Sequence, residues 1–151
     1  MTTRSFVQVA EAIARRAHAG QVDKSGVDYI SHPERLAAGV RTHSGDDTAV
    51  AAAWLHDVLE DCDVTAGDPL EAGIPAPVIE AVRAVTKTEG ETLEDYCARV
   101  RANPTALLVK RADIEDNTDP DRTALLPVQV RVRLAAKYAR VRSLLGFPQP
   151  A

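Results

Sequence analysis

Two pairs of ionisable residues stand one helical turn apart near the middle of the chain. His56 and Asp57 come first, and Glu60 and Asp61 follow after two apolar residues. At about 100° per residue, all four fall within an arc of roughly 140° on one face of a helix. A bound cation would relieve the repulsion and desolvation of such a cluster. The pattern therefore fits a metal site, and it also fits the solvated end of a helix that carries a histidine by chance.

The residues around this cluster predict one helix over 47–60, with Asp46 or Asp47 as its N-terminal cap. One side of this helix is apolar and would pack into a core. Ala49 and Ala53 fall on the polar side, where their small side chains would leave room above the cluster for a ligand. The apolar side is formed by Ala51, Ala52, Leu55, Val58 and Leu59.

The rest of the chain also has the apolar spacing of helices, and it lacks the alternation typical of strands. Pro33, Pro104 and Pro127 stand at expected helix starts, where the missing N–H of proline costs nothing. Because no repeat, linker or low-complexity run divides the chain, residues 1–151 are expected to form a single all-α domain. The other predicted helices cover 5–19, 33–40, 77–86, 92–102, 104–117 and 127–145, with loops at 20–28 and, around a brief helical turn, 62–75.

The composition excludes several classes of protein. A net charge of −4 over 151 residues and a pI near 5.5 argue against a nucleic-acid surface, because phosphate binding needs an excess of Lys and Arg. No apolar run is long enough for a membrane span, and Met1 to Arg4 open no signal peptide, so we expect a cytoplasmic protein. Cys62 and Cys97 are too few and too far apart for a zinc cluster or a disulfide framework.

Three further segments accompany the LHDVLED stretch at 55–61. They read AHAGQVDKSG leading into YISHP over 17–33, VTK at 85–87, and KRADIEDN at 110–117. In order and spacing the four segments resemble the HD-domain phosphohydrolases, in particular the hydrolase domain of Rel/SpoT-type alarmone enzymes, whose pattern reads AHxGQxRKxGxPYIxHP, LLHDVxED, VTK and KLADRxHN. The resemblance implies a helical HD-domain bundle that removes the 3′-pyrophosphate of (p)ppGpp. The chain stops where the long enzymes would begin a synthetase domain, so the resemblance is to the small alarmone hydrolases.

The resemblance implies that His32, His56, Asp57 and Asp113 bind a metal ion. Two imidazoles and two carboxylates from separate helices form a mixed nitrogen and oxygen site, which suits Mn²⁺, Fe²⁺ or Zn²⁺ better than Mg²⁺. The family resemblance implies Mn²⁺, whereas the ligand types leave Fe²⁺ and Zn²⁺ open. In isolation, His32 would be interpreted as a helix cap and Asp113 as a buried acid paired with Lys110 or Arg111.

Glu60 and Asp61 receive the acid–base role by the same resemblance, because a nearby carboxylate can orient a water that a metal activates and accept its proton. Lys24 matches the substrate-binding lysine of the family. Lys110 and Asn117 share a helical stripe with Asp113, where Asn117 would contact the substrate and Lys110 would offset charge or only keep Asp113 ionised. Lesser candidates for the lining of the same cavity are Arg122 and Tyr138, while His18 is interpreted as structural and His43 is given no role.

The chain departs from the alarmone hydrolase pattern at positions expected to face the substrate. Asp23 replaces an arginine and Asp28 replaces a proline, and negative charge there should repel a polyphosphate or lose a base contact. Two alternatives therefore stand beside (p)ppGpp hydrolysis: hydrolysis of another nucleotide or phosphoester, such as an NADPH-like one, and a nucleotide-sensing module without turnover. A sensing module would have no need for both Glu60 and Asp61.

Overall fold

The computed structural model describes residues 4–43, 45–61 and 67–150, with the side chains at positions 60, 61, 67 and 70 outside the described part. The described chain is helical, and its only strand-like pairing is an isolated bridge between Val22 and Asp28. This confirms the all-α prediction. The helices are α1 (Phe6–Ala17), α2 (Ser31–Thr42), α3 (Asp47–Leu55), α4 (Val58–Asp61), α5 (Gly67–Glu71), α6 (Ala76–Val85), α7 (Leu93–Arg101), α8 (Pro104–Asn117), α9 (Pro120–Thr123) and α10 (Val128–Leu145).

Side-chain caps explain where several of these helices begin. The side chain of Ser5 accepts a hydrogen bond from the N–H of Gln8, whose own side chain accepts one from the N–H of Ser5. Asp46 caps α3 and Thr92 caps α7 in the same way, each accepting from the N–H three residues later. At the other end of the chain, α10 stops at Gly146, which adopts a left-handed φ of 78°.

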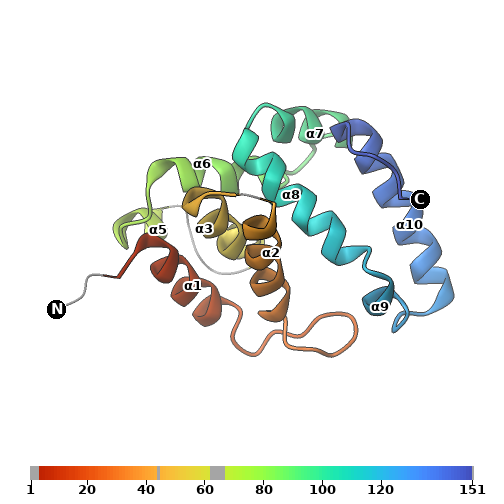
Figure 1. The fold of residues 1–151 in the computed structure, drawn as a ribbon, viewed down its shortest axis with the longest axis horizontal. Coiled ribbons are helices and arrows are strands. Elements are labelled where there is room, and N and C mark those ends of the chain that lie inside the picture. Colours follow the sequence, from red (N-terminus) through yellow and green to blue (C-terminus); the bar gives the residue numbers. More distant parts are fainter. Residues whose placement is uncertain (1–3, 44, 62–66, 151) are drawn as a thin grey trace.

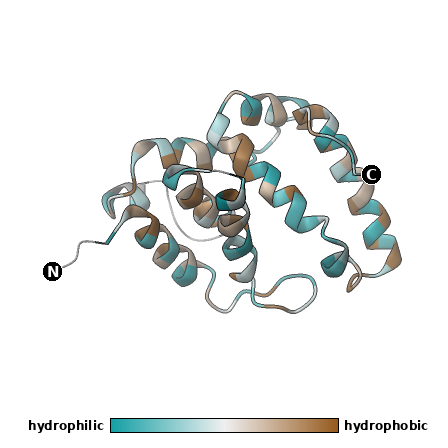
Figure 2. Ribbon diagram, in the orientation of Figure 1, coloured by the Kyte–Doolittle hydropathy of each residue, from teal (hydrophilic) through white to brown (hydrophobic). Residues whose placement is uncertain are grey.

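Helix α3 is the centre of the fold, and α1, α2, α6 and α8 pack around it (Figure 1). Every residue from Ala49 to Leu55 is buried. The alanines of α3 allow the surrounding helices to approach closely on all sides. Helix α8 lies between α2 and α10, and its C-terminal half is largely hydrophilic (Figures 1 and 2).

The structure corrects two features of the helix predicted over 47–60. Helix α3 ends at Leu55, His56 and Asp57 form a turn, and the separate helix α4 follows. The side chain of His56 explains the break, because its Nδ1 lies 2.8 Å from the carbonyl oxygen of Ala53, the acceptor that the N–H of Asp57 would use in a continuous helix. Ala49 and Ala53 are fully buried in the core and do not lie above a ligand cavity.

Helix α10 packs against α7, and the buried residues of α10 lie in its C-terminal half. Tyr138, Val141 and Leu145 are buried, whereas Val128 and Val132 in the first half are more than 60% exposed. The short helix α9 lies between α8 and α10, where the sequence predicted only a helix end and a connection. In the described residues, no helix has the length and apolar character required to cross a membrane.

Candidate metal and substrate site

Two imidazoles and one carboxylate converge at the centre of the molecule. His32 comes from the first turn of α2, His56 from the turn after α3, and Asp113 from α8. One ligand atom from each lies within 4.8 Å of the others, and all three residues are buried. The Nε2 atom of His32 is 2.9 Å from Oδ1 of Asp113, and Nε2 of His56 is 3.8 Å from the same oxygen. The structure thus brings together three of the four residues predicted to bind metal.

Asp57, the fourth predicted ligand, lies at the edge of this cluster. Its Oδ2 atom accepts a hydrogen bond from the hydroxyl of Tyr29 and lies 2.8 Å from Nε2 of His56. Burial raises the pKa of Asp57, but the charge and close contact of His56 and the hydrogen bond from Tyr29 together outweigh this effect, and the net shift is downward. An ionised Asp57 beside His56 can therefore serve as an additional oxygen ligand, and the Tyr29 hydroxyl holds the same oxygen that faces His56.

The charges of the cluster suit a bound cation. Burial lowers the pKa of His32, but hydrogen bonds to Asp113 and Asp116 raise it to about 9. Burial likewise lowers the pKa of His56, and the charge of Asp57 shifts it upward overall. The proton that His32 carries at neutral pH thus balances nearby carboxylate charge at the position where a divalent ion would take its place.

The hydrogen bonds of His56 also fit metal binding. Its Nδ1 atom lies beside the Ala53 carbonyl oxygen, which can only accept, so the proton belongs on Nδ1. Its Nε2 atom is fully buried and makes no well-aligned hydrogen bond among the described residues, despite the nearby carboxylate of Asp57. With Nδ1 donating to the backbone, Nε2 has its lone pair directed at the cluster, which is the arrangement of a metal-binding histidine.

Lys110 and Asn117 both contact Asp113, as their helical stripe predicted. The Nζ atom of Lys110 lies 3.1 Å from Oδ2 of Asp113, and Nδ2 of Asn117 lies 3.0 Å from Oδ1. Burial raises the pKa of Asp113, but Lys110 and the imidazoles lower it far below its usual range. Lys110 therefore helps to keep Asp113 ionised. It also lines the cavity described below, where its charge could offset that of a substrate.

A cavity of about 210 Å³ adjoins the cluster on the side of α7 and α10. Three lysines line it: Lys87, which follows the end of α6, Lys110 and Lys137 of α10. The Nζ atoms of Lys87 and Lys110 each lie 5.5 Å from the centre of the Tyr96 ring, whose electron-rich face attracts the two positive charges. Burial and the two neighbouring lysines lower the pKa of Lys137. We call this space the lysine cavity.

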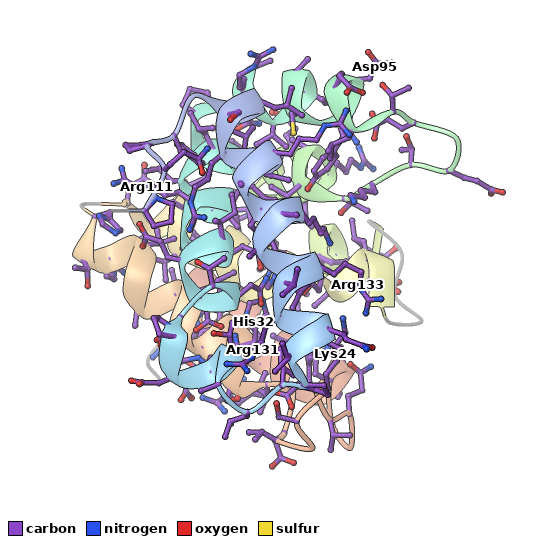
Figure 3. The ribbon with its side chains drawn as sticks, turned by 90° about the vertical axis from the view of Figure 1, so that its right-hand side faces the viewer. Lys24, His32, Asp95, Arg111, Arg131 and Arg133 are labelled. Carbon is purple, nitrogen blue, oxygen red and sulfur yellow. The ribbon has the colours of Figure 1, made fainter. Side chains whose placement is uncertain are left out.

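A second cavity, of about 350 Å³, meets the cluster at His32. The loop before α2 forms one wall with Val22, Asp23 and Lys24, and Leu126 and Leu134 form an apolar wall opposite. We call this space the loop cavity. Both cavities share four lining residues, which therefore stand between them: Tyr29, His32, Asn117 and Tyr138. Figure 3 shows His32 behind the first half of α10, with Lys24 at the lower end of that helix.

The residues that were expected to oppose a polyphosphate differ in their placement. Asp23 lines the loop cavity, but its Oδ1 accepts hydrogen bonds from the N–H groups of Ser25 and Val27, at 2.8 and 3.0 Å. Its Oδ2 lies 3.6 Å from Arg122, which partly balances its charge. Asp28 is exposed and lines neither cavity.

We predict that Asp23→Asn lowers the KM for a nucleotide polyphosphate about fivefold, because removal of one like charge near a phosphate is worth roughly 1 kcal/mol or more. Asparagine keeps the oxygen that holds the loop, whereas Asp23→Arg would lose it. The measurement is steady-state kinetics, with Asp28→Asn as the matched control. Equal KM values in Asp23→Asn and the parent would mean that position 23 faces no phosphate.

Several predicted residues fall outside the converged site. The side chains of Glu60 and Asp61 lie outside the described part, and the backbone places both on α4, one turn beyond the His56–Asp57 turn. His18 is buried against Gln21 and the Tyr29 ring, in agreement with a structural role. His43 is exposed and lies 3.1 Å from Glu115. By contrast, Arg122 lines the loop cavity and Tyr138 lines both cavities, as predicted. Cys97 is buried, and Cys62 lies outside the described residues.

Sequence reasoning missed three residues that the structure places at the site. Lys137 and Tyr96 come from helices far from the motifs, and no motif marks them. Asp116 stands where the family pattern has histidine, and its carboxylate lies 2.5 Å from Nδ1 of His32. That departure from the pattern was the available signal, because an acid one helical turn after a metal ligand can reach a neighbouring histidine.

Comparison with known proteins agrees with this fold and these motifs. The HD domain family model matches residues 10–148, and the chain belongs to this family. A solved structure described as a metazoan ortholog of SpoT that hydrolyses ppGpp superposes with a TM-score of 0.75, covering 96% of this chain and 88% of that one at 22% identity. The likeness confirms the HD-domain bundle predicted from the motifs.

Two curated relatives are much longer proteins. The guanosine-3′,5′-bis(diphosphate) 3′-pyrophosphohydrolase of Vibrio cholerae is 44% identical over 77 residues, which is 51% of this chain and 11% of that protein. The probable GTP pyrophosphokinase of Mycobacterium leprae is 32% identical over 146 residues, which is 91% of this chain and 18% of that protein. The chain thus spans less than a fifth of the length of either relative.

Proposed function

We propose that this protein is a metal-dependent phosphohydrolase that removes the 3′-pyrophosphate from (p)ppGpp. The observation that carries the proposal is the position of the His32–His56–Asp113 cluster in the wall of the lysine cavity, which His32 shares with the larger, partly apolar loop cavity. A nucleotide with phosphate groups at one end and a flat base at the other matches these two spaces. The substrate is supported by the relatives, two of which are described as acting on ppGpp or guanosine-3′,5′-bis(diphosphate).

The names of the relatives do not agree on the reaction. One is named a pyrophosphohydrolase and another a probable GTP pyrophosphokinase, although both are similar to this chain. Our proposal favours hydrolysis, because a cluster of His and Asp residues that binds a divalent ion is suited to the activation of water. Transfer of pyrophosphate to GTP would also need a place for a second nucleotide.

We propose that the ion is Mn²⁺, held by His32, His56, Asp57 and Asp113. Two nitrogen and two oxygen ligands suit Mn²⁺, with Fe²⁺ and Zn²⁺ as alternatives. When bound, such an ion polarises a phosphoryl oxygen and makes water more acidic. The His56 lone pair directed at the cluster and the low pKa of Asp113 support this set of ligands.

The other residues bind the substrate and move protons. Lys87, Lys110 and Lys137 neutralise the phosphates in the lysine cavity, and Asn117 donates a hydrogen bond at the boundary between the cavities. Water attacks the phosphorus atom that is bonded to the ribose 3′-oxygen. The bond between this phosphorus and the 3′-oxygen breaks, and the products are GDP and pyrophosphate. Glu60 or Asp61 accepts the proton of the water, and the ribose 3′-oxygen takes up a proton as it leaves.

Asp23 favours a second candidate within the same chemistry, a nucleotide that carries less charge near the loop, such as an NADPH-like phosphoester. A screen of nucleotides with Mn²⁺ present separates the two, if phosphate and pyrophosphate release are measured independently. Pyrophosphate release from ppGpp supports the main proposal. Phosphate release from NADPH alone supports the second, and binding of ppGpp without turnover would indicate a sensing module.

The lysine cavity makes its own prediction. Lys137→Met should raise the KM for ppGpp about fivefold or more, because one attractive charge near a phosphate is worth roughly 1 kcal/mol in bulk water and several times that in a shielded site. The matched control is Arg133→Met, an exposed cation on the same helix that lines neither cavity. If both variants change KM equally, only the overall charge of α10 matters.

A further inference from the structure

His32 of α2 contacts the carboxylate of Asp116, and the family pattern has no carboxylate at that position. Nδ1 of His32 lies 2.5 Å from Oδ2 of Asp116, while Nε2 faces Asp113 at 2.9 Å. Both His32 and Asp116 are buried, so solvent does not compete for this contact. When Nδ1 carries the proton and donates it in a hydrogen bond to Asp116, Nε2 has its lone pair free to face the cluster.

Asp116 is itself held by two guanidinium groups from different helices. Arg35, one turn after His32 on α2, makes a two-point contact, with Nε 2.6 Å from Oδ1 and Nη2 3.1 Å from Oδ2. Arg122 of α9 donates from Nη1 to Oδ2 at 2.8 Å and to the backbone oxygen of Asp116 at 2.9 Å. Two-point contacts between arginine and a carboxylate fix its orientation as well as its charge.

The residues of this network replace those of the family pattern at the same positions of α8. The pattern places arginine directly after the metal-binding aspartate and histidine two residues later, where this chain has Ile114 and Asp116. Ile114 is buried in the core at 2% exposure and offers no charge. The positive charge near Asp116 comes from α2 and α9 instead.

We propose that Asp116 is a positioning residue for the metal site, and that Arg35 and Arg122 hold it in place. The carboxylate accepts the Nδ1 proton of His32 and turns Nε2 toward the ion, as outer carboxylates do for metal-binding histidines. Arg122 also lies 3.6 Å from Asp23 in the wall of the loop cavity, so the network extends from the metal ligand to the substrate space. The inference rests on the proposed metal site and is independent of the substrate.

Metal affinity tests this role without any measurement of turnover. Titration of Mn²⁺ into the metal-free full chain, by calorimetry, should show affinity 10- to 100-fold weaker in Asp116→Ala than in the parent. Glu115→Ala is the matched control, because Glu115 is the preceding residue on α8 and, among the described residues, forms its ion pairs with Arg111 and His43 at the surface. We expect the control to bind Mn²⁺ within twofold of the parent.

A spectroscopic measurement separates positioning from general damage to the fold. With Zn²⁺ bound, ¹⁵N spectra of the parent should show His32 with its proton on Nδ1 and the metal on Nε2, and Asp116→Ala should lose this pattern while His56 keeps it. Equal Mn²⁺ affinity in a folded Asp116→Ala, with an unchanged His32 spectrum, would overturn the proposal.

Two further outcomes are decisive. If Asp116→Ala does not fold, the isosteric Asp116→Asn replaces it, and affinity equal to that of the parent would overturn the role of the charge. Weaker binding in Asp116→Asn, with a parental far-ultraviolet circular dichroism spectrum, supports it. A parent protein that binds no divalent ion would overturn the metal site itself, which distinguishes that failure from a failure of Asp116.

Discussion

Replacement of His56 by alanine is expected to remove the bound ion and nearly all turnover. The Nε2 atom of His56 is buried and directed at the cluster, and its loss leaves one imidazole in the proposed set of ligands. A catalytic ion contributes several kcal/mol to phosphoester hydrolysis, so loss of the ion should lower kcat/KM by about 10³-fold or more. Metal analysis after dialysis and steady-state kinetics measure the two effects.

His43→Ala is the matched control for this variant. His43 is an exposed histidine that contacts Glu115 and lines neither cavity. It should keep the metal content and the turnover of the parent. An unchanged metal content in His56→Ala would show that the ion, if any, is bound elsewhere.

Glu60→Gln and Asp61→Asn should separate the two effects, because we expect them to lose turnover and to keep the metal. Neither residue is a proposed ligand, so metal content should stay near that of the parent, while loss of the acid–base group should lower kcat by about 10²–10⁴-fold. Metal analysis and kcat are measured on the same preparations, with Glu80→Gln, an exposed acid on α6, as control. If both variants retain the parental kcat, the pair is only structural.

The helices could be predicted because their signals are local. The caps at Asp46 and Thr92 mark helix starts by hydrogen bonds that form within four residues, and Pro104 marks one because its missing N–H costs nothing in the first turn. The break after Leu55 could not be predicted from periodicity, because it depends on the contact of the His56 side chain with the Ala53 carbonyl. The burial of Ala49 and Ala53 depends on which helices surround α3, and spacing along one helix does not report this.

The same contrast applies to the site. His32, His56 and Asp113 were identified because their motifs keep the family order, and the structure brings them together. Lys137 lies 20 residues beyond the last motif position, Asn117, and reaches the lysine cavity only because α10 returns along α7. Arg35 shows no motif either, and its role follows from the contact with Asp116 across two helices.

Product analysis of a single reaction tests the central claim most directly. The full chain is incubated with ppGpp and Mn²⁺, the reaction is stopped with a chelator, and the products are separated by anion exchange. We predict GDP and pyrophosphate in equal amounts, with no product from His56→Ala. Release of orthophosphate instead of pyrophosphate, or turnover by His56→Ala at the parental rate, would contradict the account.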